Sequence, residues 1–258
     1  MVASCHSVPT CYTFLTIFEA LRPFKAMLSF GLMDTQDQII EEFYTKHYYL
    51  LFTQNKLLNH LKARTHINLE KNLTRDTYER VLEIGSGNGE HFSFVSHSFK
   101  FFTMLDVHDS PLRQRLTDSR IDFIKADIET FGFRDKQYDR IIMSCVLHHL
   151  ANPLQALYNI REMLSPNGIF SLFLPCDPGI SNRLNRFLFV NPTAKSLGIK
   201  NYNLVNAIEH RNHFLSLNQM VNYVFNDFTI KVKYFPFRIN SHNLNAYAVY
   251  QIYRSDVK

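Results

Sequence analysis

Three glycines stand at alternate positions in the segment VLEIGSGNG, directly after a short apolar run. The whole chain of 258 residues has only 8 glycines, so the cluster of Gly85, Gly87 and Gly89 needs an explanation. Glycine tolerates positive φ angles and lets a ligand approach the backbone, and the turn after the first strand of an open α/β sheet is the floor of its ligand site. The glycines therefore indicate either a ligand-binding turn or a tight strand-to-helix turn without a ligand.

The spacing of these glycines narrows the class of ligand. A dinucleotide-binding turn has the pattern G-x-G-x-x-G, which would place the third glycine at the position of Glu90. The segment also lacks the G-K-[ST] ending of a nucleoside triphosphate loop. The sequence thus disfavours NAD and nucleoside triphosphates as ligands.

Residues further along the chain give this turn a family resemblance. VLEIGSGNG resembles the first motif of the class I S-adenosylmethionine-dependent methyltransferases, a hydrophobic residue followed by D/E-x-G-x-G-x-G. Asp106 ends the next apolar run, about 20 residues after the glycines, and Asp127 ends the third run. The segment YDRIIMSCVLHHLANPLQALYNIREMLSPNGIF resembles the family's fourth and fifth segments, so the likeness covers residues 81–175.

The resemblance implies a site for S-adenosylmethionine. A carboxylate can accept hydrogen bonds from both hydroxyls of a ribose, which suits Asp106, while Asp127 would contact the adenine amine and Ile128 would pack against the ring. The methionine carboxylate would lie near the glycine turn and the N-terminus of a helix expected after it. Acids at strand ends also cap turns, which is the alternative for both aspartates. The implied cofactor residues are Glu83, Gly85, Ser86, Gly87, Gly89, Asp106, Val107, Asp127, Ile128 and Ser144.

The chemistry of methyl transfer points to further candidates. Transfer from a sulfonium is an in-line displacement, so the protein must mainly align and desolvate the acceptor and, for a hydroxyl, remove its proton. His148 and His149 directly follow the fourth predicted strand and are candidate bases, although a packing or capping role explains them equally well. Residues 144–147 replace a [DN]-P-P-[YFW] motif, which argues against methyltransferases that act on adenine or on glutamine amides.

An insertion at residues 176–213 lies between the fifth predicted strand and the next helix, where it is expected to cover the cleft as a substrate cap. Arginine suits the recognition of carboxylate or phosphate, which favours an anionic acceptor such as a sugar phosphate or a glycan. A surface insertion with exposed charges is the alternative. His210 and His213 lack a third metal ligand, so no metal site is predicted. The candidate substrate residues are Arg183, Arg186, His210 and Arg211.

The elements that position these residues follow from the apolar pattern. Five short apolar runs, separated by segments of helical character, predict parallel strands joined by helical crossovers. Asn152-Pro153 predicts a helix start and SPNG at 165–168 a turn, and two later segments predict an antiparallel closing pair. The expected fold is α/β, a Rossmann-like doubly wound, mostly parallel seven-stranded sheet with an antiparallel closing strand pair and an N-terminal helical extension. The predicted strands are 80–84, 101–105, 121–127, 138–147, 169–175, 228–237 and 246–254.

The N-terminal part divides into two predicted segments. Residues 1–32 form a poorly defined extension, whose apolar stretch is interrupted by charged residues and a proline, so neither a membrane helix nor a secretory signal is predicted. A capping box beginning at Thr35 predicts a helix that ends near Ala63, within a helical segment at 33–78. Residues 79–258 form the predicted cofactor-binding domain.

The composition agrees with a soluble protein, since 46% of the residues are hydrophobic and 20% are charged. The four cysteines form no CxxC pair, which favours a reducing, cytoplasmic location. The net charge of +5 comes from scattered residues, and no RNA-binding module is evident. We therefore expect a cytoplasmic S-adenosylmethionine-dependent methyltransferase of a small molecule or glycan. A protein or RNA acceptor, or a non-catalytic methyltransferase-like scaffold domain, is the alternative.

Overall fold

The computed structural model describes residues 38–71, 73–109, 116–130 and 137–254. The chain forms two compact units, which divide between Tyr49 and Leu50. The predictions for residues 1–32 and for the capping box at Thr35 lie outside the described residues.

The described part of the first unit is helical from residue 38 onward and includes the π-helical turn η1 (Phe43–His47). The ring of Phe43 packs edge to face against Tyr44 and Tyr48, at centroid distances of 5.5 and 6.1 Å. The helix α3 (Tyr48–Thr53) runs across the boundary between the units. Phe43 is therefore a buried residue of this helical segment.

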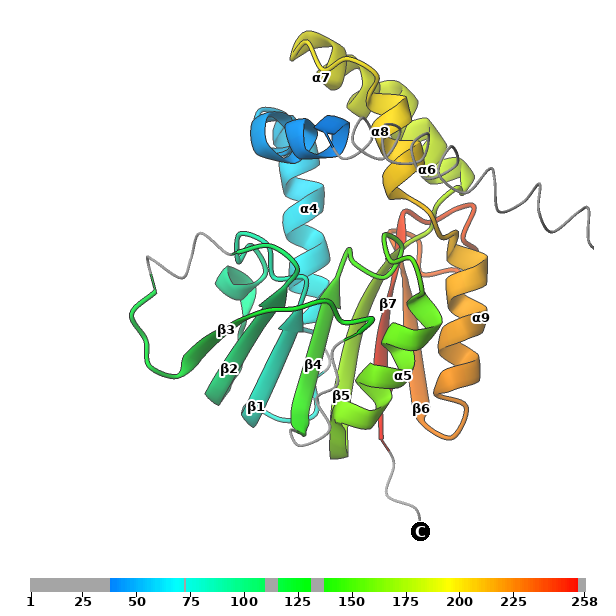
Figure 1. Ribbon diagram of the computed structural model, residues 1–258. Coiled ribbons are helices and arrows are strands. Elements are labelled where there is room, and N and C mark those ends of the chain that lie inside the picture. Colours follow the sequence, from blue (N-terminus) through cyan, green and yellow to red (C-terminus); the bar gives the residue numbers. More distant parts are fainter. Residues whose placement is uncertain (1–37, 72, 110–115, 131–136, 255–258) are drawn as a thin grey trace, which may run out of the picture. The chain divides into compact units, whose positions relative to one another are not determined.

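The second unit contains a seven-stranded sheet with the strand order β3-β2-β1-β4-β5-β7-β6 (Figure 1). Strands β1 to β5 pair with one another in parallel, whereas β7 runs antiparallel to both β5 and β6. The predicted Rossmann-like sheet with an antiparallel closing pair is therefore confirmed. The strands are β1 (Thr77–Ile84), β2 (Ser98–Asp106), β3 (Ile121–Lys125), β4 (Tyr138–Ser144), β5 (Leu164–Pro175), β6 (Thr229–Phe235) and β7 (Tyr247–Tyr253).

Two helices cover one face of this sheet, α5 (Pro153–Met163) and α9 (Phe214–Val224) (Figure 1). The Asn152 side chain caps α5 by accepting a hydrogen bond from the backbone nitrogen of Gln155 at 3.2 Å, as the Asn-Pro pair predicts. The apolar side chains of both helices pack in one cluster with those of the central strands. This core fixes the positions at which the parallel strands end.

The opposite face is covered by α4 (Lys56–Leu69), whose last residue, Leu69, packs against Phe173 and Tyr247 of the sheet. The sequence predicts one continuous helix that ends near Ala63, and this prediction is wrong. The chain leaves the helical conformation at Asn55, which has φ −93° and ψ 107°, and the Asn55 side chain then caps α4. A good N-cap residue inside a periodic apolar pattern thus divides the helix into two.

Two other local expectations are wrong. No α-helix follows the glycine turn in the described residues; only the short 3₁₀ helix η2 (Phe92–Phe94) forms there. The segment between Gly89 and the start of β2 is instead held by a buried polar network, in which His91 binds Glu70. The predicted turn at 165–168 lies within the bounds of β5, although Asn167 keeps a turn-like φ of 61°.

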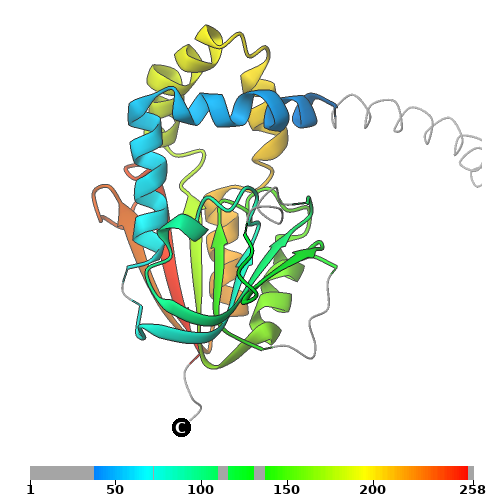
Figure 2. The ribbon, with the colours of Figure 1, turned by 90° about the vertical axis from the view of Figure 1, so that its left-hand side faces the viewer.

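The insertion after β5 is helical. It lies on the side of the sheet where β4 and β5 end (Figures 1 and 2). Its elements are α6 (Ile180–Asn185), the π-helical turn η4 (Arg186–Val190), α7 (Asn191–Ser196) and α8 (Tyr202–Glu209). Within the part of the chain that the structure describes, no helix is long and apolar enough to cross a membrane.

Candidate cofactor and acceptor site

The glycine turn at the end of β1 leaves an open space beside its backbone. The φ angles are 72° at Gly85, 49° at Gly87 and 70° at Gly89. A side-chain carbon at Gly85 would lie 2.1 Å from Cγ2 of Val146, so this glycine lets the turn pack against the segment after β4. A side-chain carbon at Gly87 would meet no atom of the described residues within 4 Å. Gly87 therefore has the surroundings expected of a backbone that lies against a ligand.

Asp106, the last residue of β2, fixes the shape of this turn. Its Oδ2 accepts a hydrogen bond from the backbone nitrogen of Gly87 at 2.8 Å, and its Oδ1 accepts one from that of His108 at 2.9 Å. The backbone nitrogen of Gly85 donates to the carbonyl oxygen of Leu105 at 2.8 Å. A small depression borders the turn, lined by Ser86, Met104, Asp106, His108, Asp109, Phe123, Ile124 and Lys125.

The other implied cofactor residues lie at the ends of neighbouring strands. Asp127 follows β3 and caps a turn, because its Oδ1 accepts a hydrogen bond from the backbone nitrogen of Glu129 at 2.9 Å. Val107 is exposed, Ser144 is half-buried at the end of β4, and Ile128 is buried in the apolar core. Any contact of these residues with a cofactor stays a prediction.

Glu83 and Ser86 each have a side-chain oxygen without a hydrogen-bond partner among the described residues. Oε2 of Glu83 and Oγ of Ser86 are buried and accept or donate no hydrogen bond within the described residues. Burial, and then the negative charges of Glu70 and Asp106, raise the pKa of Glu83 to about 8. A ligand with a positive charge would favour the ionised carboxylate. The amino group of a bound amino-acid moiety fits this environment, so these residues fit S-adenosylmethionine.

The pKa of Glu83 leads to a prediction for stability without ligand. An unfolded glutamate releases its proton near pH 4.5, whereas the folded one keeps it to about pH 8, so the free energy of unfolding falls as the pH rises between these values. Glu83→Gln removes this dependence and should unfold at a higher temperature than the wild type at about pH 9, with little difference at about pH 5. Thermal unfolding across this range checks the result. Glu79→Gln, at an exposed position of β1, is the control, and equal pH dependence in all three proteins would contradict the assignment.

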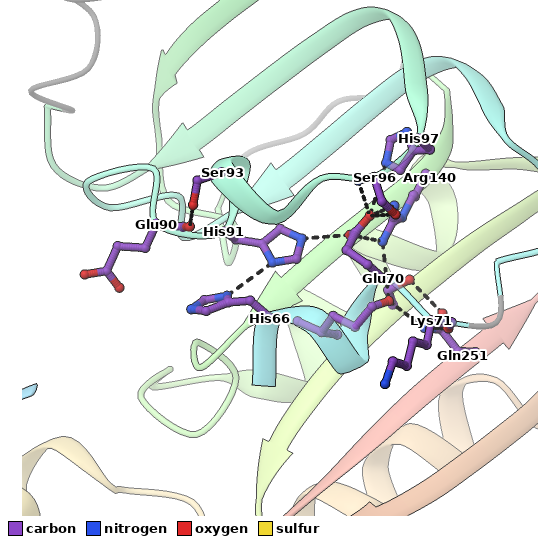
Figure 3. A network of polar contacts seen from close by, with 12 residues as sticks. His66, Glu70, Lys71, Glu90, His91, Ser93, Ser96, His97, Arg140 and Gln251 are labelled. Atoms are coloured by element: carbon purple, nitrogen blue, oxygen red, sulfur yellow. Dashed lines mark hydrogen bonds and ion pairs between the residues drawn. The ribbon is translucent and has the colours of Figure 1, made fainter. Parts of the chain in front are cut away.

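A buried ion pair joins the end of α4 to β4 (Figure 3). Nη2 of Arg140 lies 2.6 Å from Oε1 of Glu70, and Nη1 lies 3.0 Å from Oε2, so the pair is bidentate. Arg140 is 0% exposed. Burial alone would raise the pKa of Glu70, but hydrogen bonds from His91 and Arg140 hold that pKa well below its usual range. Glu70 is therefore an ionised carboxylate inside the protein.

The same carboxylate holds the segment after the glycines, as Figure 3 shows. Nε2 of His91 donates to Oε1 of Glu70 at 3.0 Å, and the backbone nitrogen of Ser96 donates to Oε2 at 3.1 Å. Nδ1 of His91 lies 3.2 Å from Nδ1 of His66, whose pKa is lowered to about 3 by burial and then by the charge of His91. Glu70 thus fixes this segment where an α-helix was expected.

Three histidines meet beside the end of β4. The ring centroids are 3.9 Å apart for His148 and His149, 4.7 Å for His148 and His210, and 5.6 Å for His149 and His210. Burial, and then the charges of the other two histidines, lower the pKa of His148 well below its ordinary value. Its Nδ1 is buried without a hydrogen-bond partner in the described structure. The fold thus places both candidate bases beside a histidine of the predicted cap.

Asp177 follows β5 and connects the cap to the sheet. Its Oδ2 accepts hydrogen bonds from Nδ1 of His210 at 2.7 Å and from Nη1 of Arg186 at 2.8 Å. Burial alone would raise the pKa of Asp177, but these hydrogen bonds outweigh it and lower the pKa. In the same region, Nδ1 of His149 donates to the carbonyl oxygen of Glu209 at 2.9 Å. Glu209 and His210, at the end of α8, therefore bind His149 after β4 and Asp177 after β5.

The predicted substrate residues separate into two groups. Arg186 and His210 belong to the cluster around Asp177, and the charge of Arg186 is offset by that carboxylate. Arg183 and Arg211 are exposed and make no side-chain contact with this cluster. Within the described ranges, no group of three or more His, Cys, Asp or Glu is arranged to hold a metal ion. The sequence alone does not identify Glu70, His91, Arg140 and Glu209 as members of these polar networks. Only Arg140 is unusual in the sequence, because it is an arginine inside an apolar run.

Comparison with known proteins relates part of the chain to methyltransferases. Residues 82–172 match the family of methyltransferase domains. An uncharacterized methyltransferase of Mycobacterium tuberculosis is 24% identical over 107 residues, which are 40% of this chain and 54% of that protein. Methyltransferase str3 of Strobilurus tenacellus is 33% identical over 91 residues, 35% of this chain and 33% of that protein. The chain thus matches about half the length of the mycobacterial relative.

Solved structures extend the likeness to the whole fold. N-methyltransferase NodS from Bradyrhizobium japonicum, in complex with S-adenosylhomocysteine, has a TM-score of 0.57 at 16% identity, covering 86% of this chain and 98% of that chain. The plantazolicin methyltransferase BpumL, also in complex with S-adenosylhomocysteine, has a TM-score of 0.58 at 15% identity, covering 89% and 98%. The chain therefore matches a methyltransferase domain over residues 82–172 and has the fold of these methyltransferases. Its resemblance to the class I S-adenosylmethionine-dependent methyltransferases is confirmed in sequence over this domain and in fold.

Proposed function

We propose that this chain transfers a methyl group from S-adenosylmethionine to a small-molecule or glycan acceptor in the cytoplasm. The observation that carries the proposal is the edge of the sheet at β1 and β2. Within the described residues, Gly87 faces open space, Asp106 holds the turn, and Oε2 of Glu83 is buried without a hydrogen-bond partner. The cysteines in the described part, Cys145 and Cys176, are free thiols, which supports a reducing compartment.

The residues present can hold each part of the cofactor. Asp106 already accepts two backbone hydrogen bonds, but an ionised carboxylate has about four acceptor sites, so it can also accept from ribose hydroxyls. Asp127 would accept from the adenine amine, and Glu83 with Ser86 would bind the amino-acid part. When bound, the cofactor supplies a methyl group that its sulfonium charge has already activated. The chain must then align the acceptor, exclude water and receive any proton that the acceptor releases.

The cap supports a small acceptor. The helices α6, α7 and α8 lie on the side of the sheet where β4 and β5 end (Figure 2). Glu209 and His210, at the end of α8, bind His149 and Asp177. Among the structural neighbours, NodS is an N-methyltransferase and BpumL has a structure with a desmethyl plantazolicin analogue. From these neighbours we extend methyl transfer, but not the acceptor atom, to the present chain as part of the proposal. A protein or RNA acceptor is the second candidate, and the net charge of +5 favours it.

Thermal unfolding with S-adenosylhomocysteine tests the proposal. Ligand at about 100 times its dissociation constant should stabilise the wild type by about 2.7 kcal/mol, a rise of a few degrees in Tm. Asp106→Ala should lose this stabilisation, whereas Asp122→Ala, which removes an exposed carboxylate from β3, should keep it. A folded wild type whose Tm does not respond to the ligand would overturn the proposal.

A further inference from the structure

His210 is held in the orientation of a general base. Its Nδ1 donates to Asp177, so in the neutral ring Nε2 carries the free electron pair. Nε2 has no hydrogen-bond partner among the described residues, and the side chain is 27% exposed, so the atom is accessible. Because Arg186 also binds Asp177, that carboxylate stays ionised and can stabilise a protonated imidazole.

The neighbouring groups are less suited to this role. His148 is buried, and its lowered pKa shows that the protein disfavours its charged form. His149 donates to a carbonyl oxygen of Glu209, with the carboxylate of that residue at 3.3 Å, so its ionic partner is more distant than that of His210. Tyr202 has a pKa raised to about 12 by burial, so it stays neutral. His149 and His210 are equally exposed, at 27%. The difference lies in the carboxylate, because His210 donates directly to Asp177 at 2.7 Å, whereas the carboxylate beside His149 is at 3.3 Å and its Nδ1 donates to a carbonyl oxygen instead.

The pair of His210 and Asp177, which we call the dyad, lies on the same side of the sheet as the glycine turn. Val146 lies against the turn at Gly85 and belongs to the loop after β4, which also carries the other two histidines. The backbone nitrogen of Asn212 donates to the carbonyl oxygen of His148 at 3.1 Å, which holds the end of the cap against the same loop. Ligands of doubly wound sheets bind at the carboxyl ends of the strands, where the strand order reverses, here between β1 and β4. The dyad thus borders that crevice from the β4 and β5 side.

We propose that His210 is the general base of this site and that the acceptor atom is a hydroxyl oxygen, so that the chain is an O-methyltransferase. This inference rests on the proposed function. The acceptor hydroxyl gives its proton to Nε2 of His210 while its oxygen forms a bond to the methyl carbon. The carbon–sulfur bond breaks with its electron pair going to sulfur, which leaves a methyl ether, S-adenosylhomocysteine and a protonated His210. A neutral hydroxyl is a poor nucleophile and needs this proton removal during attack, whereas a neutral amine can attack first and lose its proton afterwards.

The experiment uses 4-nitrophenol as the acceptor probe, because its phenolate is yellow and the phenol is not. The full chain is mixed with the probe, with and without saturating S-adenosylhomocysteine, at a pH where the free probe is mostly protonated. The wild type should bind the probe and increase the phenolate band. His210→Asn should abolish that increase. The asparagine amide can still donate to Asp177, so this variant keeps the contact between cap and sheet while removing the base. His60→Asn, at an exposed position of α4 outside the site, is the matched control and should behave like the wild type.

Turnover with S-adenosylmethionine and the same probe gives a second readout. His210→Asn should lower kcat by about 10²–10⁴-fold, with the affinity for S-adenosylhomocysteine measured by calorimetry unchanged. The loss of kcat at low pH, which reports protonation of the base in the wild type, should disappear in the variant. A dyad that only fastens the cap would instead leave kcat intact in His210→Asn.

Other outcomes of these experiments would overturn different parts of the proposal. If the wild type produces no phenolate, or methylates 4-nitroaniline in preference to 4-nitrophenol, the hydroxyl assignment is overturned. If phenolate forms equally in His210→Asn, the base is another group. A wild type that fails to bind S-adenosylhomocysteine overturns the proposed function, and the phenolate measured without that ligand then still decides whether His210 accepts a proton.

Discussion

Arg140→Met is expected to lower the free energy of unfolding by about 3–5 kcal/mol. The substitution removes one partner of a buried, bidentate ion pair and leaves the Glu70 carboxylate inside the protein with its negative charge uncompensated. His91 and Ser96 would still donate to Glu70, so the segment after the glycines keeps part of its support. Urea unfolding monitored by circular dichroism measures the change.

The double variant Glu70→Met/Arg140→Met separates a charge effect from a packing effect. Replacing both ions by apolar side chains of similar size should cost less than Arg140→Met alone, because no buried charge then lacks a partner. Arg120→Met, which breaks an exposed pair with Asp118, is the control and should change stability little. A double variant as unstable as the sum of its two single variants would contradict this account.

Gly87→Arg is expected to weaken binding of S-adenosylhomocysteine by at least about 100-fold, or about 2.7 kcal/mol. The new side chain would extend into the space beside the turn that the cofactor is proposed to occupy. Methyl transfer should be abolished for the same reason. Isothermal titration calorimetry measures the affinity directly.

Gly198→Arg is the matched control for backbone strain. Gly198 follows α7, has a φ of 70° and also meets nothing within 4 Å of an added side-chain carbon. Both variants therefore force an arginine into a left-handed conformation and add one positive charge. The two should lose similar stability, but only Gly87→Arg should lose affinity. Equal affinity in both variants would remove the glycine turn from the site.

The sheet could be predicted because its signals are local. Short apolar runs, glycines after the first run and an acid at the end of the second indicate β1 and β2 and the turn between them. The antiparallel pair β6 and β7 is likewise marked by two strand-like segments close together in the sequence. The helix expected after Gly89 was wrong because its neighbours are held by Glu70, which lies on the far side of β1 in the sequence.

The side-chain networks could not be predicted because their partners are far apart in the chain. Arg140 and Glu70 are separated by 70 positions, and His210 and Asp177 by 33. No periodic pattern records such a pairing, which arises only when the strands and the cap are folded together. An arginine inside the apolar run YDRIIM indicated that β4 carries a charge, but not that the charge is buried and paired.

A crystal structure of the chain grown with saturating S-adenosylhomocysteine would test the proposed cofactor site. We expect one bound ligand at the carboxyl ends of β1 and β2, with its ribose hydroxyls on Asp106, its adenine beside Asp127 and its amino group on Glu83. A ligand bound elsewhere, or crystals in which saturating ligand leaves the turn around Gly87 empty, would contradict it.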